Sequence, residues 1–140
     1  MKKLACFAAI AAVLLVTTPL SAHHSARAQY LENAPLVRIE GVVKGFFFMN
    51  PHTYLRVTDD KIVDSSGVPV SFDVEWAPGG VLRQQGLERN SFKEGDHVII
   101  TGNPSHNASD HRLYLRTIDR PSDGFHAEQP FNAFPWLGIR

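Results

Sequence analysis

The feature that most limits the fold is a long stretch of β-strand character, residues 35–49, which reads PLVRIEGVVKGFFFM. Apolar and charged residues alternate from Val37 to Lys44, the two-residue period of a strand with one buried face. Gly41 and Gly45 interrupt this pattern, as glycine does where a strand bends sharply or carries a bulge. A strand that bends in this way can pair with different neighbours along its two halves. The stretch therefore favours a barrel built around one bent strand.

Four further strands and one short helix are predicted along the rest of the chain. The strands are expected at 52–59, 68–76, 96–102 and 112–119, and the helix at 81–87. This order is typical of a five-stranded Greek-key barrel of the oligonucleotide/oligosaccharide-binding (OB) type. The predicted fold class is therefore all-β, an OB-like barrel with one short helix between the third and fourth strands. A plain β-sandwich is the alternative.

One face of these strands is predicted to form the core, because its apolar residues alternate with polar neighbours and a one-residue slip would expose the whole set. A tail at 123–140, rich in aromatic residues and proline, is expected to be irregular. Its aromatic residues are expected to pack on the barrel or to meet a partner, and packing is favoured because exposed aromatic patches are unusual. The predicted core consists of Val37, Ile39, Val43, Leu55, Val57, Phe72, Val74, Trp76, Val98, Ile100, Leu113 and Leu115.

Residues 1–22 have the three-part pattern of a secretory signal peptide. Two lysines supply a positive start, residues 4–16 form an uninterrupted apolar run, and Ser21-Ala22 resembles a cleavage site. The run is shorter than the roughly 20 residues that span a bilayer, so we expect cleavage and no permanent membrane anchor. The mature protein is expected to be periplasmic or secreted, with its barrel domain at 23–122. The one cysteine, Cys6, would leave with the signal peptide.

The composition of the mature chain excludes some classes of partner. Removal of Lys2 and Lys3 reduces the 14 basic residues to 12, against 14 acidic ones, so the net charge is about −2. Nucleic acid is not an expected partner, because phosphate binding needs clustered positive charge. No cysteine nucleophile and no G-x-S-x-G motif is present in the mature sequence. We therefore expect a protein that is not an enzyme.

His23, His24 and His52 are the strongest candidates for metal binding, because imidazole nitrogen suits copper, zinc and nickel. Cleavage after Ala22 would allow the new α-amine and the His23 ring to chelate one metal ion. Cleavage one residue earlier would place a histidine second and third, and a third-place histidine allows a square-planar nitrogen set that favours Cu(II). His52 follows an Asn-Pro turn and would add a nitrogen from the scaffold. The alternative is that the paired histidines form a solvated chain end.

Two pairs of outward-facing residues form a second candidate site. Tyr54 and Arg56 share one face of the second strand, and Tyr114 and Arg116 share one face of the fifth. Aromatic and guanidinium groups together make good binding surfaces. The same pattern also arises from the ordinary alternation of an exposed strand face. We treat these four residues as a predicted ligand face.

Two groups of polar residues are assigned no function. Asp73 and Glu75 alternate on the third strand opposite the apolar face, and their spacing is interpreted as the solvated side of a half-buried sheet. His106, Asp110 and His111 lie in one polar loop, where polar residues are common for reasons of exposure alone.

Several short strings occur together in an order that resembles an exported bacterial family of small proteins of unknown function. They are AHHS, NPH before a strand, SFKEGDHVIITG and LRTID, and they cover most of residues 22–119. Members usually begin with HHS and carry a TNPH-like turn, where this chain has MNPH. The resemblance implies an OB-like barrel and export, and no established activity.

We therefore expect a small exported binding or accessory protein that binds copper through its N-terminal histidines. The alternative is an interaction module that docks a periplasmic protein partner through the barrel face or the aromatic tail.

Overall fold

The structure is a computed structural model and describes residues 26–129 of the chain. The predicted signal peptide, His23 and His24 lie outside these residues. No helix within 26–129 is long and apolar enough to cross a membrane. In chain order the elements are α2 (Ala26–Gln29), β1 (Val37–Phe47), β2 (Thr53–Val63), β3 (Pro69–Trp76), α3 (Gly79–Gln84), β4 (His97–Pro104), the 3-10 helix η1 (Ala108–Asp110), β5 (Arg112–Arg120) and β6 (Phe125–Glu128).

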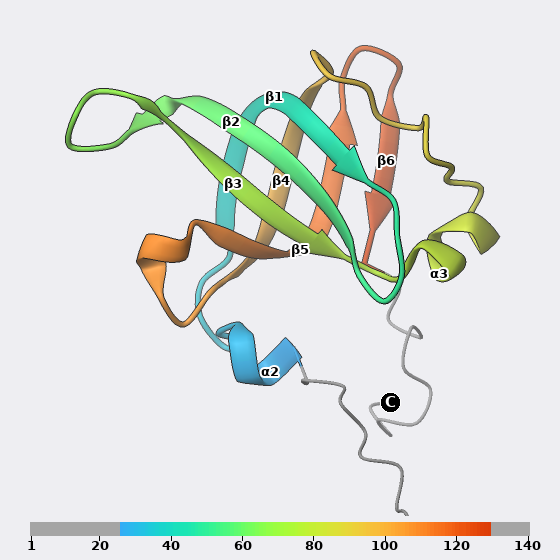
Figure 1. The fold of residues 1–140 in the computed structure, drawn as a ribbon, viewed down its shortest axis with the longest axis horizontal. Coiled ribbons are helices and arrows are strands. Elements are labelled where there is room, and N and C mark those ends of the chain that lie inside the picture. The colour runs from blue at the N-terminus through green and yellow to red at the C-terminus, as the bar shows by residue number, and fades with distance from the viewer. Residues whose placement is uncertain (1–25, 130–140) are drawn as a thin grey trace, which may run out of the picture.

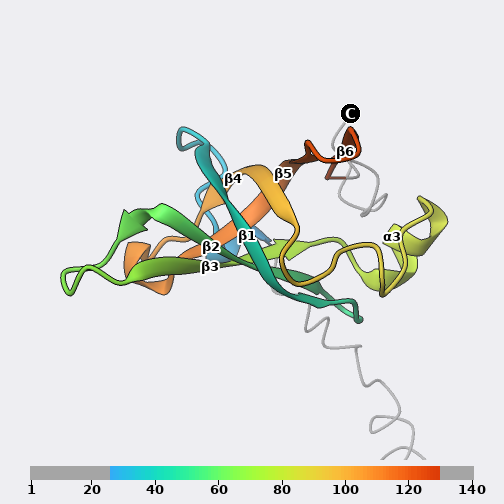
Figure 2. The same cartoon turned by 90° about the horizontal axis from the view of Figure 1, so that it is seen from above.

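Strands β1 to β5 form a closed barrel (Figure 1). β1 pairs antiparallel with both β2 and β4, β2 pairs with β3, and β4 pairs with β5. A short parallel pairing between β3 and β5 closes the ring. The predicted OB-like fold is thus confirmed, and α3 lies between β3 and β4 as expected. In Figure 2, the tip of the β2–β3 hairpin and α3 lie at opposite ends of the molecule.

β1 contributes to both halves of the barrel because it changes partners along its length. Residues 37–42 pair with β4 and residues 42–47 pair with β2, with a shift of register between Val43 and Gly45. Gly41 lies at the change of partner. A Cβ atom at this position would lie 2.0 Å from the main-chain oxygen of Thr58 on β2. Glycine is required here because the two strands approach too closely for any side chain.

The predicted core is confirmed with one adjustment. Every predicted core residue is buried except Val37, which is half-buried at the start of β1 and packs against the cluster. The structure extends this core toward α3 and the loop that follows it. The additional buried apolar residues of this cluster are Phe48, Val70, Ala77, Leu82, Leu87, Phe92 and Ile118.

The first part of the tail differs from the sequence-based expectation. Residues 125–128 were expected to be irregular, but they form β6, which pairs antiparallel with β5. Phe125 packs against the core, and its ring meets the Phe92 ring edge-on at 5.4 Å between centroids. The packing expected for the tail is therefore confirmed for Phe125, while Phe131, Phe134 and Trp136 lie outside the described residues. The sheet therefore continues past residue 122 through β6.

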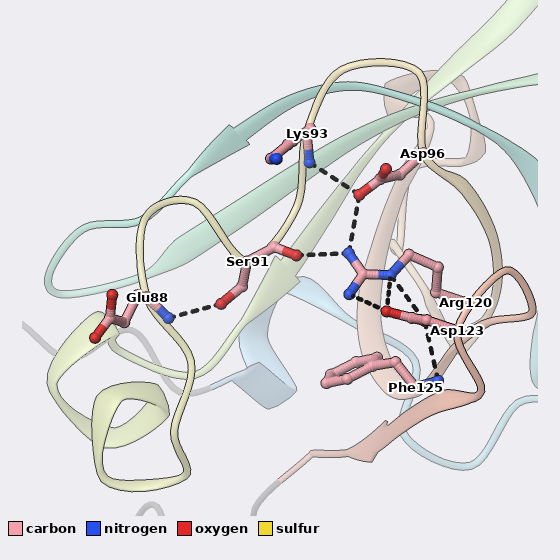
Figure 3. A network of polar contacts seen from close by, with 7 residues as sticks. All are labelled: Glu88, Ser91, Lys93, Asp96, Arg120, Asp123 and Phe125. Carbon is pink, nitrogen blue, oxygen red and sulfur yellow. Dashed lines mark hydrogen bonds and ion pairs between the residues drawn. The ribbon is translucent and has the colours of Figure 1, made fainter.

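Arg120 fastens β6 and its turn to the loop before β4 (Figure 3). Its guanidinium donates hydrogen bonds to Asp96 Oδ2 at 2.9 Å and to Asp123 Oδ2 at 2.8 Å. The same group lies over the rings of Phe92 and Phe125, at 4.9 and 5.4 Å from their centroids. Charge-assisted hydrogen bonds and cation–π contacts therefore meet at one mostly buried side chain.

Candidate functional site

The barrel closure brings a row of polar side chains together on its outer face. Tyr54 on β2 is in register with Glu75 on β3, and Glu75 is in register with Tyr114 on β5. Successive strand residues point to opposite faces, so these three side chains lie opposite the core. The two residue pairs of the predicted ligand face therefore share one surface, and β3 runs between them.

Glu75 is the centre of this surface. It is 4% exposed, although the sequence pattern assigned it to the solvated side of the sheet. The hydroxyl of Tyr30 donates a hydrogen bond to Glu75 Oε2 at 2.7 Å, and His52 Nδ1 lies 2.8 Å from Glu75 Oε1. The interpretation of Glu75 as solvated was therefore wrong. We call Tyr30, His52, Tyr54, Glu75 and Tyr114 the Glu75 cluster.

Glu75 is buried because the chain before β1 crosses this face. We call residues 26–34 the N-terminal arm. The Tyr30 ring lies 5.4 Å from the Tyr114 ring, centroid to centroid, and Tyr30 is 2% exposed. In Figure 1, α2, the first part of the arm, lies beside the loop between β4 and β5. An aromatic ring from outside the barrel thus covers a carboxylate that strand alternation alone would leave in water.

The arm is held to β4 and to the loop that follows it by main-chain and side-chain hydrogen bonds. The Leu31 amide donates to the main-chain oxygen of Pro104 at 2.9 Å, and the His106 amide donates to that of Gln29 at 3.0 Å. The buried Asn103 side chain donates from Nδ2 to the main-chain oxygens of Leu31 and Glu32, at 3.0 and 3.2 Å. The N-terminal arm is therefore packed against the outside of the barrel and held there by these hydrogen bonds.

The environment of the cluster keeps its phenols protonated. Burial, followed by the charge of the Glu75 carboxylate, raises the pKa of Tyr30 well above its ordinary value. Burial and Glu75 also raise the pKa of Tyr54, and burial raises the pKa of Tyr114. A protonated phenol remains a hydrogen-bond donor toward the carboxylate. Tyr30 can therefore hold Glu75 in place over a wide range of pH.

His52 is oriented by this carboxylate and remains reachable from solvent. Its side chain is 33% exposed, and its ring lies 6.5 Å from the Tyr54 ring between centroids. The turn that carries it is tied to α3, because the Gly80 amide donates to Asn50 Oδ1 at 3.1 Å. A carboxylate beside Nδ1 favours the tautomer with its proton on Nδ1, which leaves the Nε2 lone pair available to a ligand.

On β5, both residues of the predicted ligand face form hydrogen bonds with other residues of the protein. Arg116 donates a hydrogen bond from Nε to Asn103 Oδ1, and the Tyr114 hydroxyl accepts one from Gln129 Nε2 at 2.8 Å. On β2, Arg56 forms two hydrogen bonds with Asp73, at 2.7 and 3.0 Å. The structure thus brings the predicted face together, but it engages both arginines in internal contacts.

Asp110 and His111, from the polar loop between β4 and β5, have partners of their own. Asp110 Oδ1 accepts a hydrogen bond from Asn107 Nδ2 at 2.8 Å, and His111 meets the Phe72 ring edge-on at 5.6 Å. Within residues 26–129, no group of three or more His, Cys, Asp or Glu side chains is arranged to hold a metal ion. His52 is thus not part of a metal-binding group of this kind within the described residues.

Tyr30 and Glu75 are the site residues that sequence reasoning missed. They are 45 positions apart, and their contact depends on how the arm crosses a seam between β3 and β5. The order of the barrel strands was the available signal, because pairing of β3 with β5 places Glu75 between the tyrosines of β2 and β5. To use this signal, one must also know which residues of β3 and β5 pair with each other.

The fold and the cluster define a small OB-type barrel whose outer face holds one buried carboxylate between a histidine and an N-terminal arm. The chain belongs to a family described as a family of unknown function (DUF6152), whose model matches residues 11–114. The matched range includes the whole Glu75 cluster, and the resemblance to a family of unknown function is confirmed. No curated protein and no solved structure gives a significant match to the chain.

Proposed function

We propose that the mature protein is an exported binding module that holds one copper ion at His52 together with His23 and His24, and that it has no catalytic activity of its own. The observation that carries this proposal is the contact of 2.8 Å between His52 Nδ1 and the buried carboxylate of Glu75. Metal-binding histidines usually give their second ring N–H to a carboxylate or carbonyl, which fixes the ring and makes the other nitrogen more basic. His52 has this arrangement, and its side chain is accessible.

The position of the arm supports the participation of the N-terminal histidines. Tyr30 and His52 contact the same carboxylate, and α2 begins at Ala26, two residues after His24. Helical residues rise by about 1.5 Å and extended ones span at most about 3.6 Å. His24 is therefore within roughly 15 Å of Tyr30 along the chain. This is short enough for the N-terminal nitrogens to approach Nε2 of His52.

The choice of copper follows from the donor set. The three histidines supply imidazole nitrogen, and either cleavage position adds the α-amine of the new terminus. Nitrogen donors suit copper, and Cu(II) has the highest affinity among divalent first-row metals for a given site of this kind. Zinc and nickel compete for the same donors and belong in the experiment as comparison ions.

The proposal requires export and cleavage, so the first prediction concerns processing. We expect N-terminal sequencing of the protein recovered from the periplasm or the medium to read His-His-Ser, which corresponds to cleavage after Ala22. A start at Ala22 would indicate cleavage one residue earlier and would retain the copper site in its third-place histidine form. Recovery of only the full-length chain in the membrane fraction would contradict the proposal.

The second prediction concerns affinity for copper. Calorimetric titration of Cu(II) into the processed protein should give one site, and His52→Ala should weaken it at least tenfold because one fixed nitrogen donor is lost. His126→Ala is the matched control, since His126 is 52% exposed and bonded to Asp119 on another part of the sheet. Equal and weak affinities in the wild type and His52→Ala would overturn the proposal.

The affinity should also depend steeply on pH. Protons compete with the metal for imidazole, with an ordinary pKa near 6.5, and for an α-amine, near 7.7–8.0. Binding of Cu(II) should therefore weaken progressively as the pH falls from about 8 to about 5. The same titration at three pH values measures this loss, and the binding should release protons into a buffer of known ionisation enthalpy.

A second candidate function is docking of a protein partner. Phe47 and Met49 are 42% and 46% exposed, and Phe47 is in register with Tyr54 at the edge of the Glu75 cluster. Apolar side chains beside an aromatic face can contribute to an interface. Copper-dependent thermal stabilisation separates the two functions, because a ligand that binds only the folded state raises its stability. A melting temperature indifferent to copper would favour docking.

A further inference from the structure

We infer that the outer face of β1, β2 and β3 binds a neutral glycan, with a sugar ring stacked on Phe47 and its hydroxyls bonded to Arg56 and Asp73. We call these three residues the Phe47 site. They lie on the barrel itself, and the site is independent of the proposed copper ion. Phe47 is 42% exposed, and the side chains of Arg56 and Asp73 are 49% and 33% exposed. All three are therefore accessible to a ligand from solvent.

The pairing of three neighbouring strands brings the aromatic and polar parts of the site together. Phe47 on β1 is in register with Tyr54 on β2, while Arg56 on β2 is in register with Gly45 on β1 and with Asp73 on β3. Strand residues two positions apart point to the same face, so these side chains share the outer surface. The Arg56 guanidinium lies 5.8 Å from the centroid of the Phe47 ring. The aromatic ring and the charged pair are therefore neighbours.

The position of the Phe47 ring depends on the absence of a side chain at Gly45. The ring folds back along β1, so that a Cβ atom at Gly45 would lie 3.0 and 3.1 Å from its Cε2 and Cζ atoms. The ring thus fills the space over the glycine and contacts Arg56 as well. A ring that is already in place loses little conformational freedom when a ligand binds, which favours affinity.

The polar part of the site carries no net charge. Arg56 donates from Nε and Nη2 to the two carboxylate oxygens of Asp73, at 2.7 and 3.0 Å. A charged ligand would have to compete with this bidentate pair. A neutral hydroxyl can instead donate to the carboxylate or accept from the guanidinium while the pair stays intact, because the pair uses only part of the hydrogen-bonding capacity of each group. The site therefore favours an uncharged ligand rich in hydroxyls.

A sugar ring of the glucose type combines the properties that the Phe47 site requires. Its hydroxyls lie around the rim, and its C–H bonds point to the two faces of the ring. One such face can bury apolar surface against an aromatic ring, while neighbouring rim hydroxyls reach the arginine and the aspartate. A wholly apolar ligand would instead cover the charged pair without any compensating hydrogen bond. We therefore assign the site to a neutral, glucose-type glycan.

Saturation-transfer NMR with cellotetraose, in the presence of a chelator, tests the assignment. We expect a dissociation constant on the order of 0.1–1 mM, because the site is open and small, and the strongest transfer to the C–H protons of one ring face. Sorbitol has comparable hydroxyls without a ring and should show no transfer. The affinity should differ by less than about twofold between low and high salt, since no net charge is involved. Absence of transfer from about 10 mM cellotetraose would overturn the inference.

Phe47→Ala should weaken cellotetraose binding about tenfold, because the stacking surface is lost. Met49→Ala is the matched control, since Met49 is 46% exposed in the loop after β1 and offers no ring. It should leave the affinity unchanged. Arg56→Lys keeps the charge but loses the planar fork, so it should weaken binding about fivefold. Equal losses for Phe47→Ala and Met49→Ala would overturn the inference, because they would indicate a general apolar surface.

Gly45→Ala tests the site without removing any group assigned to the ligand. The new Cβ would meet the far end of the Phe47 side chain, which can turn away, so we expect the barrel to remain folded. Displacement of the ring should weaken cellotetraose binding about fivefold, with little change in the melting temperature. Binding that is unchanged in both Gly45→Ala and Phe47→Ala would overturn the inference. None of these measurements contains copper, so their failure would leave the proposed function intact.

Discussion

Phe72→Ala is expected to lower the free energy of unfolding by about 3–5 kcal/mol, the usual cost of removing a buried aromatic ring. Phe72 lies on β3 inside the barrel and is 8% exposed. Its loss removes apolar contacts and leaves a cavity that neighbouring strands cannot fill, because the ring of hydrogen-bonded strands restricts their approach. Urea denaturation monitored by circular dichroism measures this loss. The midpoint urea concentration should fall, while the slope of the free energy of unfolding against urea concentration stays the same.

Phe47→Ala is the matched control for this prediction. It removes the same side chain from β1 at a position that is 42% exposed, so less apolar surface is returned to water. We expect a loss below about 1 kcal/mol, including its contact with the Arg56 guanidinium. Similar losses for the two variants would show that the inner and outer faces of the barrel are wrongly assigned.

Gly41→Ala should destabilise the protein by about 3 kcal/mol or more, although it adds a single methyl group. The new Cβ would lie 2.0 Å from the main-chain oxygen of Thr58, which cannot move aside like a flexible side chain. To relieve this clash, β1 and β2 would have to move apart at the point where β1 changes its pairing partner. Overpacking typically costs about 1–3 kcal/mol and more where the backbone is the obstacle. Thermal unfolding measures the loss.

Gly80→Ala provides the comparison. Gly80 lies in α3, where the nearest atom to an added Cβ is Asn50 Oδ1 at 3.8 Å, an ordinary contact. Alanine in a helix is favoured over glycine by about 1 kcal/mol, so this variant should be neutral or slightly more stable. If Gly41→Ala behaved in the same way, β1 and β2 would not approach as closely as the structure indicates.

The barrel could be predicted from the sequence because its core follows a local rule. Alternation along each strand identified the inner face, and the glycines of β1 marked where the strand bends. β6 was missed because its four residues offer too short a run for a period to be recognised. Its strand conformation depends on pairing with β5 and on the contacts of Phe125 with the core, and neither can be read from local pattern.

The candidate site was predictable only in part. His52 was identified from its residue type and its place after a turn, properties that belong to the sequence. Glu75 was rejected because alternation reports which side of a strand a residue faces, but not what covers that side. The covering group, Tyr30, comes from a segment with little recognisable secondary structure, and only the folded chain brings its hydroxyl to the carboxylate.

The seam between β3 and β5, which closes the barrel, is expected to be the first part of its wall to open locally. β3 and β5 are joined by three residue pairs, whereas β2 and β3 are joined by eight. Local opening starts where few contacts must be broken, so the amides of this seam should exchange with solvent before those of its neighbours. Tyr30 contacts Glu75 on β3 and Tyr114 on β5, so it holds the two strands of the seam together from the outer face. The segment that precedes the first strand therefore covers the weakest pairing of the barrel wall, and the Glu75 cluster lies at the place where the wall would otherwise open.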